Sequence, residues 1–165
     1  MFVVLGVTGH TGSAVAETLL SQKQPVRVVV RSADKAADWK ARGADVAVAS
    51  LDDMPALAKA FEGANGVYLL VPPNYGAEAW SADQQARMDR AAEAVKKSGI
   101  GHVVFLSSIG GQLPSGTGPI RAVHYGEEKL VGAVKHITIL RPPSFMENWT
   151  PMIGAAKTQG VLPTF

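Results

Sequence analysis

Residues 2–16 read Phe-Val-Val-Leu-Gly-Val-Thr-Gly-His-Thr-Gly-Ser-Ala-Val-Ala, and this stretch decides the fold. An apolar, β-rich run ends at Gly6, glycines recur at positions 9 and 12, and apolar residues with helical spacing follow. This order predicts a strand, a tight glycine turn and a helix. Glycines leave no Cβ where an anion must approach, and the start of the helix points free N–H groups and its positive dipole end at that anion.

The glycine spacing is compatible with a bound dinucleotide. It is Gly-x-x-Gly-x-x-Gly from Gly6 to Gly12, one residue longer in the first gap than the commonest dinucleotide fingerprint. A P-loop is excluded because Ser13, and no lysine, follows the last glycine. The pattern alone also fits a glycine-rich turn that holds no ligand, so this alternative stays open.

Further β-rich runs follow the first one, and a helical pattern separates each from the next. Strands are predicted at residues 26–30, 45–49, 66–71, 102–106 and 136–140. Helices are predicted at residues 11–23, 33–42, 53–62, 77–98 and 120–134. Because strands and helices alternate from end to end, we predict an α/β fold with one doubly wound parallel sheet of about six strands flanked by helices.

The composition agrees with such a sheet and excludes several classes of protein. Of the 165 residues, 47% are hydrophobic and 18% are charged, which suits a sheet buried on both faces. The net charge is only +2 and the charges are scattered, so no nucleic-acid partner is predicted. Cysteine is absent and the four histidines lack ligand spacing, so no metal site is predicted.

The sequence also lacks the features of a membrane or exported protein. No apolar run approaches the ~18 residues of a membrane-spanning helix. The first predicted strand begins at residue 2 and leaves no room for a signal peptide. We therefore expect a cytoplasmic protein without a membrane partner.

The end of the second predicted strand carries a basic residue, Arg31, followed by Ser32. In doubly wound sheets this position meets the adenosine ribose of a bound dinucleotide. An acidic side chain there suits the 2′-hydroxyl of NAD, and a basic one suits the 2′-phosphate of NADP. The sequence therefore predicts NADP(H) in preference to NAD(H), with a solvated arginine at a strand end as the alternative.

A tyrosine and a lysine lie four residues apart in the helix predicted after the fifth strand. Tyr125 and Lys129 would share one face of that helix. A neighbouring ammonium favours the phenolate, so Tyr125 is a candidate general acid toward a carbonyl and Lys129 its tuning partner. Ser107 and Ser108 end the fifth strand and are candidates to orient the substrate oxygen. A lysine four residues after a tyrosine arises readily by chance. The location of the pair after the fifth strand is therefore the stronger argument for a catalytic role.

Five motifs together resemble the NmrA-like group of atypical short-chain dehydrogenases/reductases. They are Gly-Val-Thr-Gly-His-Thr-Gly-Ser at 6–13, Val-Val-Val-Arg-Ser at 28–32, Val-Tyr-Leu-Leu-Val-Pro-Pro at 67–73, Phe-Leu-Ser-Ser-Ile-Gly at 105–110 and Ile-Leu-Arg-Pro-Pro-Ser-Phe-Met-Glu-Asn at 139–148. The resemblance covers nearly the whole chain. It implies a Rossmann domain at residues 1–148 that binds NADP(H).

The resemblance also implies which residues would contact each part of the cofactor. The pyrophosphate would meet Gly6, Thr8, Gly9, His10, Thr11 and Gly12. The 2′-phosphate would meet Arg31 and Ser32. If the chain is an enzyme, Lys129 would also bind the ribose. The nicotinamide side would be lined by Val71, Pro72, Pro73, Pro142, Pro143 and Phe145. Relatives often have an aspartate near the adenine where this chain has Ser50.

The group includes enzymes and proteins without catalysis, so the resemblance implies two alternative functions. One is an oxidoreductase that transfers hydride from the nicotinamide to a small-molecule acceptor, namely a quinone, an azo compound or an activated carbonyl. The other is a non-catalytic NADP(H) redox sensor that regulates a protein partner. Members continue beyond the sixth strand, so we expect residues 149–165 to be the start of a truncated or minimal substrate-side segment. By analogy, helices 77–98 and 120–134 could pair in a homodimer.

Overall fold

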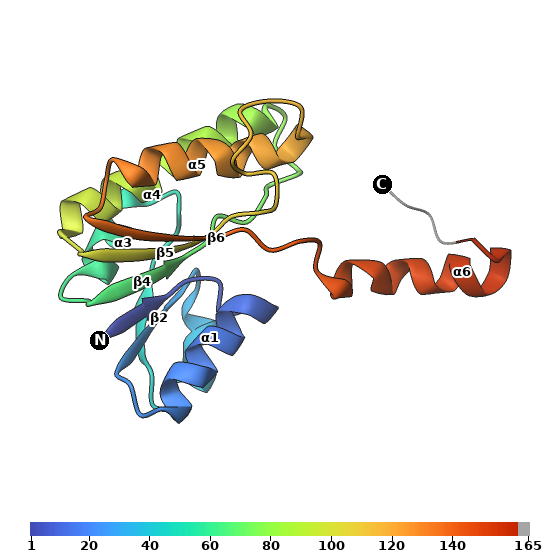
Figure 1. Cartoon of the computed structure of the whole chain (residues 1–165). Helices are drawn as coiled ribbons and strands as arrows, with labels where there is room; N and C mark the ends of the chain where they lie inside the picture. The colour runs from blue at the N-terminus through green and yellow to red at the C-terminus, as the bar shows by residue number, and fades with distance from the viewer. Residues whose placement is uncertain (162–165) are drawn as a thin grey trace.

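The computed structural model describes residues 1–161 and contains a six-stranded sheet (Figure 1). All neighbouring strands are parallel, and their order across the sheet is β3-β2-β1-β4-β5-β6. The strands are β1 (Phe2–Val4), β2 (Val26–Val30), β3 (Asp45–Val48), β4 (Gly66–Leu69), β5 (His102–Leu106) and β6 (His136–Leu140). The predicted doubly wound α/β fold is therefore confirmed.

Helices cover both faces of this sheet (Figure 1). On one face lie α1 (His10–Ser21) and α2 (Ala36–Ala41), and on the other lie α3 (Met54–Phe61), α4 (Trp80–Ser98) and α5 (Arg121–Val131). The helix starts follow local sequence signals. In α3, for example, the Asp53 carboxylate accepts a hydrogen bond from the Ala56 N–H at 3.0 Å, and a proline occupies the first turn.

The core consists of two apolar clusters, one on each face of the sheet. Val3 and Leu5 enter the cluster that contains α3 and α4, whereas Val4 enters the cluster that contains α1 and α2. Successive side chains of a strand point to opposite faces, so the first strand reads as an unbroken apolar run. The largest fully buried side chains include Phe61, Phe105, Leu57, Leu69 and Met88.

The strand order reverses beside β1, and this reversal positions the candidate site. Val3 pairs with Arg27 of β2 on one side and with Val67 of β4 on the other. The chain therefore leaves β1 toward β2 and β3, and later returns to the other side of β1 to form β4. The loops after β1 and β4 diverge at the carboxyl edge of the sheet, where doubly wound folds bind their ligands.

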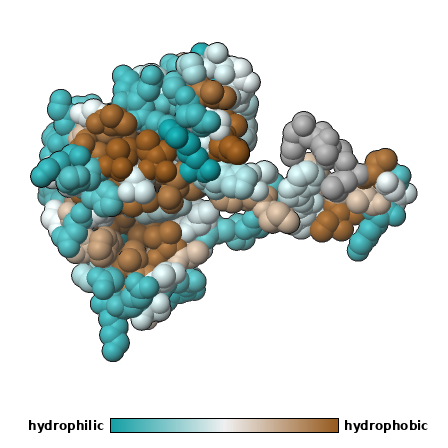
Figure 2. All heavy atoms as spheres, viewed as in Figure 1, coloured by the Kyte–Doolittle hydropathy of each residue, from teal (hydrophilic) through white to brown (hydrophobic). Residues whose placement is uncertain are grey.

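An arm extends away from the body after β6 (Figure 1). It contains the 3-10 turn η3 (Met146–Met152) and the helix α6 (Ile153–Gln159). Met146 is 80% exposed, and Ile153 and Phe145 are also exposed. Figure 2 shows hydrophobic residues on this arm and over β6 and the end of α5. The expected substrate-side segment 149–165 covers most of the arm, but its residues 162–165 lie outside the described part of the chain.

A substitution in the glycine turn would test how closely α1 must approach β1. A Cβ on Gly12 would lie 2.5 Å from the carbonyl oxygen of Leu5 and closer still to Gly6. We expect Gly12→Ala to lower the free energy of unfolding by about 1–3 kcal/mol or more, because helix and strand must move apart. Urea unfolding would measure this. Gly101→Ala is the control, since a Cβ there meets nothing within 4 Å, and equal losses for both variants would contradict the close-approach argument.

Candidate functional site

A groove of about 850 Å³ opens at the carboxyl edge of the sheet. Residues that follow five different strands line it, together with side chains from α4 and α5. From the glycine turn come Gly6, Thr8, Gly9 and Thr11, and from the ends of later strands come Arg31, Ser32, Val71, Pro72, Pro73 and Ser107. The structure thus brings together ten of the residues predicted from the sequence.

The glycine turn at the centre of the groove has the geometry of an anion site. Gly6 has φ +71°, a left-handed conformation, and a Cβ there would lie 2.6 Å from the Leu70 side chain. The Gly9 N–H bonds the Gly6 carbonyl at 2.9 Å, and Gly9 is the N-cap of α1. The first turn of α1 contains no acidic residue, so its positive dipole end is uncompensated. A pyrophosphate fits this cradle.

The rim beyond β2 is basic. Arg31 and Ser32 line the groove, and Lys35 joins them from the 3-10 turn η1 (Ala33–Lys35). Lys35 lies 3.5 Å from Asp34, its exposed neighbour. Within residues 1–161, the Arg31 guanidinium has no hydrogen-bond or ion-pair partner. An unpaired cation at this position is available for a phosphate group.

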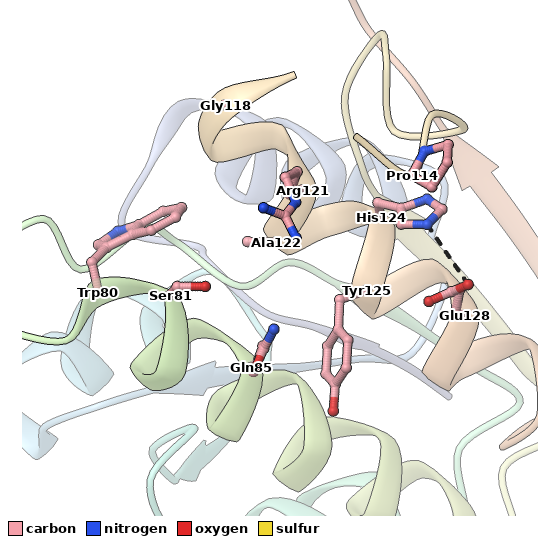
Figure 3. Close-up of a pocket in the computed structure, with 10 residues that line it drawn as sticks. All are labelled: Trp80, Ser81, Gln85, Pro114, Gly118, Arg121, Ala122, His124, Tyr125 and Glu128. Carbon is pink, nitrogen blue, oxygen red and sulfur yellow. Dashed lines mark ion pairs between the residues drawn. The ribbon is translucent and has the colours of Figure 1, made fainter. Parts of the chain in front are cut away.

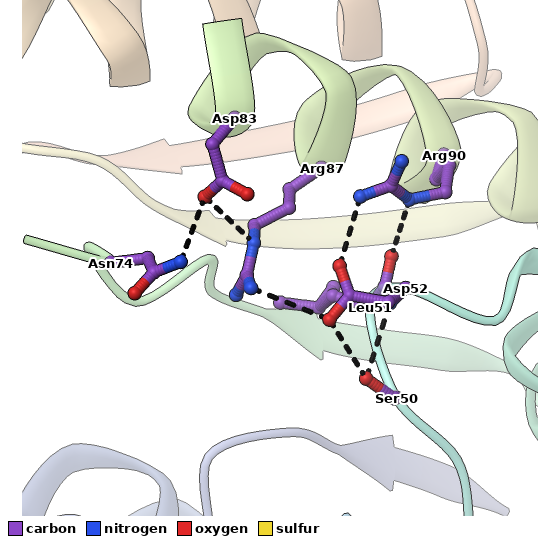
Figure 4. A network of polar contacts seen from close by, with 7 residues as sticks. All are labelled: Ser50, Leu51, Asp52, Asn74, Asp83, Arg87 and Arg90. Carbon is purple, nitrogen blue, oxygen red and sulfur yellow. Dashed lines mark hydrogen bonds and ion pairs between the residues drawn. The ribbon is translucent and has the colours of Figure 1, made fainter. Parts of the chain in front are cut away.

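The wall on the β3 side is formed by residues 50–52 and fixed by arginines of α4 (Figure 4). Asp52 accepts hydrogen bonds from Arg90 Nη2 at 2.9 Å and from Arg87 Nη2 at 3.3 Å. Arg90 Nε also donates to the Leu51 carbonyl at 2.9 Å. The Asp52 N–H donates to the Ser50 hydroxyl oxygen at 3.2 Å. Ser50 is thus part of a charged network.

The same network reaches the loop after β4. Arg87, itself a groove residue, pairs with Asp83 at 3.0 Å, and Asp83 accepts a hydrogen bond from the Asn74 side chain at 3.3 Å. Asn74 also lines the groove. Two loops that follow different strands are therefore tied to one helix, which fixes the width of this part of the groove (Figure 4).

At the other end of the groove, Ser107 contacts a buried acid. Its hydroxyl donates to Glu127 Oε1 at 2.5 Å, and Arg141 donates to both Glu127 oxygens at 3.0 and 2.6 Å. Glu127 is 5% exposed. Burial acts to raise the pKa of the Glu127 carboxyl, but the hydrogen bonds from Arg141 and Ser107 outweigh burial and hold that pKa below its ordinary value. Neither Glu127 nor Arg141 was identified from the sequence.

Tyr125 and Lys129 lie elsewhere, on the side of α5 that faces α4. The Tyr125 hydroxyl donates to the Asp89 carboxylate at 2.9 Å, and Lys129 Nζ lies 3.1 Å from the same carboxylate. Tyr125 lines a separate cavity of about 450 Å³, shown with Trp80, Arg121 and His124 in Figure 3. Neither residue lines the groove. This placement argues against the predicted role of the pair in proton transfer and ribose binding.

The other predicted residues do not line the groove. His10 begins α1, and Gly12 is buried beneath the glycine turn. The Ser108 hydroxyl lies 3.3 Å from the Ile109 carbonyl. Pro142, Pro143 and Phe145 follow β6, where the Pro142 carbonyl accepts from the Ile109 N–H at 2.9 Å and the chain then leaves toward the arm. The structure therefore does not bring the loop after β6 to the groove.

Two further features are absent from residues 1–161. Within this range, no group of three or more His, Asp or Glu side chains is placed to hold a metal ion. Among the helices of the same residues, none combines the length and the apolar character that crossing a membrane requires.

The sequence matches a family of nucleotide-binding proteins, which agrees with an anion-binding groove at the carboxyl edge of the sheet. The model of the NAD(P)H-binding family matches residues 6–160. The chain belongs to this family. It is 28% identical over 160 residues to the NAD(P)H azoreductase of Xenophilus azovorans, an alignment that covers 97% of this chain and 54% of the azoreductase.

Solved structures show that the fold of this NAD(P)H-binding family member is shared. A NADPH-dependent quinone oxidoreductase from Escherichia coli, solved with NADPH, superposes with a TM-score of 0.81 at 24% identity over 97% of this chain and 55% of that one. Triphenylmethane reductase from Citrobacter sp. gives 0.80 at 19% identity over 94% and 55%. The chain thus spans about half the length of these relatives.

The buried Glu127 makes a testable contribution to pH-dependent stability. Because its pKa is lowered by folding, its ionised form stabilises the native state above pH 4.5, and this contribution is lost as the pH falls through the lowered value. We expect Glu127→Gln to cost about 1–3 kcal/mol at pH 7 and progressively less below pH 4.5. Urea unfolding from pH 7 to pH 3 would show converging curves.

Glu93→Gln is the matched control for this experiment. Glu93 is exposed on α4 and has no partner among residues 1–161. Its substitution should change stability little at any pH in the range. If the loss caused by Glu127→Gln were the same at pH 7 and pH 3, the ionised Glu127 would not be the stabilising form.

Proposed function

We propose that this chain is the NADP(H)-binding part of an oxidoreductase that delivers hydride to a quinone, an azo compound or an activated carbonyl. The groove carries this proposal, because it joins an anion cradle at α1 to an unpaired arginine on one side and to Ser107 on the other. The azoreductase, quinone reductase and dye reductase among its relatives support acceptors of this kind. We also propose membership of the NmrA-like group, on the five motifs described above.

The preference for NADP(H) over NAD(H) rests on the rim beyond β2. Arg31, Ser32 and Lys35 offer two cations and a hydroxyl at the position where the adenosine ribose lies in doubly wound sheets. A charge-assisted hydrogen bond contributes roughly 1.5–3 kcal/mol, which corresponds to roughly a ten- to hundredfold preference. No acid of the groove occupies the position that would select the 2′-hydroxyl of NAD.

In this mechanism the protein binds and orients, and bound NADPH would supply the hydride. The turn from Gly6 to Thr11 would hold the pyrophosphate through N–H groups of α1. Val71, Pro72 and Pro73 would wall the side of the groove toward β4, where the nicotinamide half lies in this fold. Quinones and azo compounds need less acid assistance than ketones, so the proposal gives Tyr125 no chemical role.

The proposal extends to the division of the chain, its location and its oligomeric state. Residues 1–148 would form the cofactor domain, and residues 149–165 would begin the substrate-side segment. The arm with its exposed apolar residues supports this division. A cytoplasmic location and a homodimer through the α4 and α5 surface stay predictions.

Reversal of the charge at Arg31 tests the cofactor preference. We expect Arg31→Asp to weaken NADPH at least tenfold and to make NADH the tighter ligand, because a carboxylate repels the 2′-phosphate and accepts from a 2′-hydroxyl. Titration of both cofactors would measure the affinity ratio. Arg121→Asp is the control, since it makes the same charge change on α5 outside the groove. An unaltered ratio in Arg31→Asp would remove Arg31 from the 2′-phosphate site.

Consumption of NADPH by the purified chain with a panel of quinones, azo dyes and activated carbonyls tests the function. We expect acceptor-dependent consumption in which Tyr125→Phe retains activity within about twofold, whereas loss of a general acid would slow carbonyl reduction by ~10²–10⁴. If Tyr125→Phe slowed carbonyl reduction by that much, Tyr125 would be the general acid after all. Tight NADPH binding without consumption would instead leave two alternatives, a redox sensor that acts on a protein partner or a cofactor domain without its full substrate-side segment.

A further inference from the structure

Ser107 stands between the groove and a buried carboxylate. It lines the groove but is only 7% exposed, and its hydroxyl donates to Glu127 Oε1 at 2.5 Å. Glu127 receives two further hydrogen bonds from Arg141. The serine follows β5, the acid lies on α5 and the arginine follows β6, so the contact joins three separate segments.

The surroundings hold Ser107 and Glu127 in this arrangement. The Ser107 N–H donates to the Leu140 carbonyl at 2.7 Å, which fixes the backbone beside β6. The Gly111 backbone covers the pair so closely that a Cβ there would lie 2.6 Å from both Ser107 Oγ and Glu127 Oε1. The Gly111 carbonyl in turn accepts a hydrogen bond from His124 Nδ1 at 2.8 Å. Rotation of the hydroxyl away from Glu127 would leave a buried carboxylate oxygen with one partner fewer.

The direction of this hydrogen bond decides what Ser107 offers to a ligand. A serine hydroxyl has one proton and two acceptor lone pairs, and an ionised carboxylate only accepts. The bidentate contact with Arg141 requires the ionised form of Glu127. The Ser107 proton is therefore committed to Glu127, and only lone pairs remain for the groove. This argues against Ser107 as a hydrogen-bond donor to a substrate carbonyl, because a carbonyl oxygen itself needs a donor.

We propose that Glu127 makes Ser107 an obligate acceptor, and that Ser107 receives a hydrogen bond from the carboxamide N–H₂ of the nicotinamide. The inference rests on the proposed NADP(H) function. Ser107 lies at the end of β5, on the side of β1 opposite Arg31 and therefore in the half of the groove that takes the nicotinamide nucleotide. The carboxamide is the N–H donor of that half, and its orientation determines how the ring is turned in the groove.

The 3-acetylpyridine analogue of NADPH tests this assignment, because a methyl group replaces the carboxamide N–H₂. We expect the intact chain to bind NADPH roughly tenfold more tightly than the analogue, which is the effect of one lost hydrogen bond. Ser107→Ala should remove this preference by weakening NADPH and leaving the analogue unchanged. Ser108→Ala is the matched control, since Ser108 is adjacent but does not line the groove, and it should keep the preference.

A second variant tests the part played by Glu127 as a positioning residue. Glu127→Leu frees the Ser107 proton, so the hydroxyl can turn and the preference for the carboxamide should shrink while NADPH still binds. Should this variant fail to fold, the comparison of Ser107→Ala with Ser108→Ala still decides the assignment.

The outcomes separate this inference from the function on which it rests. Binding of NADPH with the same preference in Ser107→Ala as in the intact chain would overturn the Ser107 assignment and leave the proposed function standing. Equal weakening of NADPH and the analogue would also overturn it, since Ser107 would then contact a ribose hydroxyl. Absence of NADPH binding to the intact chain would overturn both.

Discussion

The close approach of α1 to the end of β1 is the constraint on which the rest of the site depends. A Cβ on Gly12 would overlap the backbone of Leu5 and Gly6, so only glycine lets the helix begin this near the strand. That closeness puts the first N–H groups of α1 at the crevice where the strand order reverses. The other walls follow, because parallel strands end at one edge of the sheet and their loops surround the same point.

The fold and the central part of the groove could be predicted from sequence because both depend on short-range patterns. The apolar run through Val3 and Val4 marks a strand buried on both faces, and the glycines after it mark the turn. Residues that follow strands must share one edge of the sheet, so Arg31, Val71 and Ser107 were predicted at positions that do line the groove. The same rule would have found Asp52 and Asn74, which also follow strands.

The features of the site that could not be predicted from the sequence depend on how each helix is rotated against the sheet. The spacing of Tyr125 and Lys129 puts them on one face of α5 but says nothing about where that face points. Gly126 determines how α5 is rotated. A Cβ on Gly126 would lie 2.6 Å from the Met88 sulfur and 3.1 Å from Phe105, so the side of α5 that carries Gly126 packs against the core. Tyr125 then faces α4. Pairs such as Arg87 with Asp52, 35 residues apart, likewise follow from tertiary packing and have no local signature.

Several charged groups around the groove hold the structure, whereas the guanidinium of Arg31 has no partner among residues 1–161. Arg87 and Arg90 are bound to Asp52, and Arg141 is bound to Glu127. Lys129 lies outside the groove and pairs with Asp89. Arg31 differs, since no described residue pairs with it. A dianionic phosphate in the groove would therefore be attracted most strongly to Arg31. Each of the other three arginines named here already has a carboxylate within hydrogen-bond distance, which offsets its positive charge.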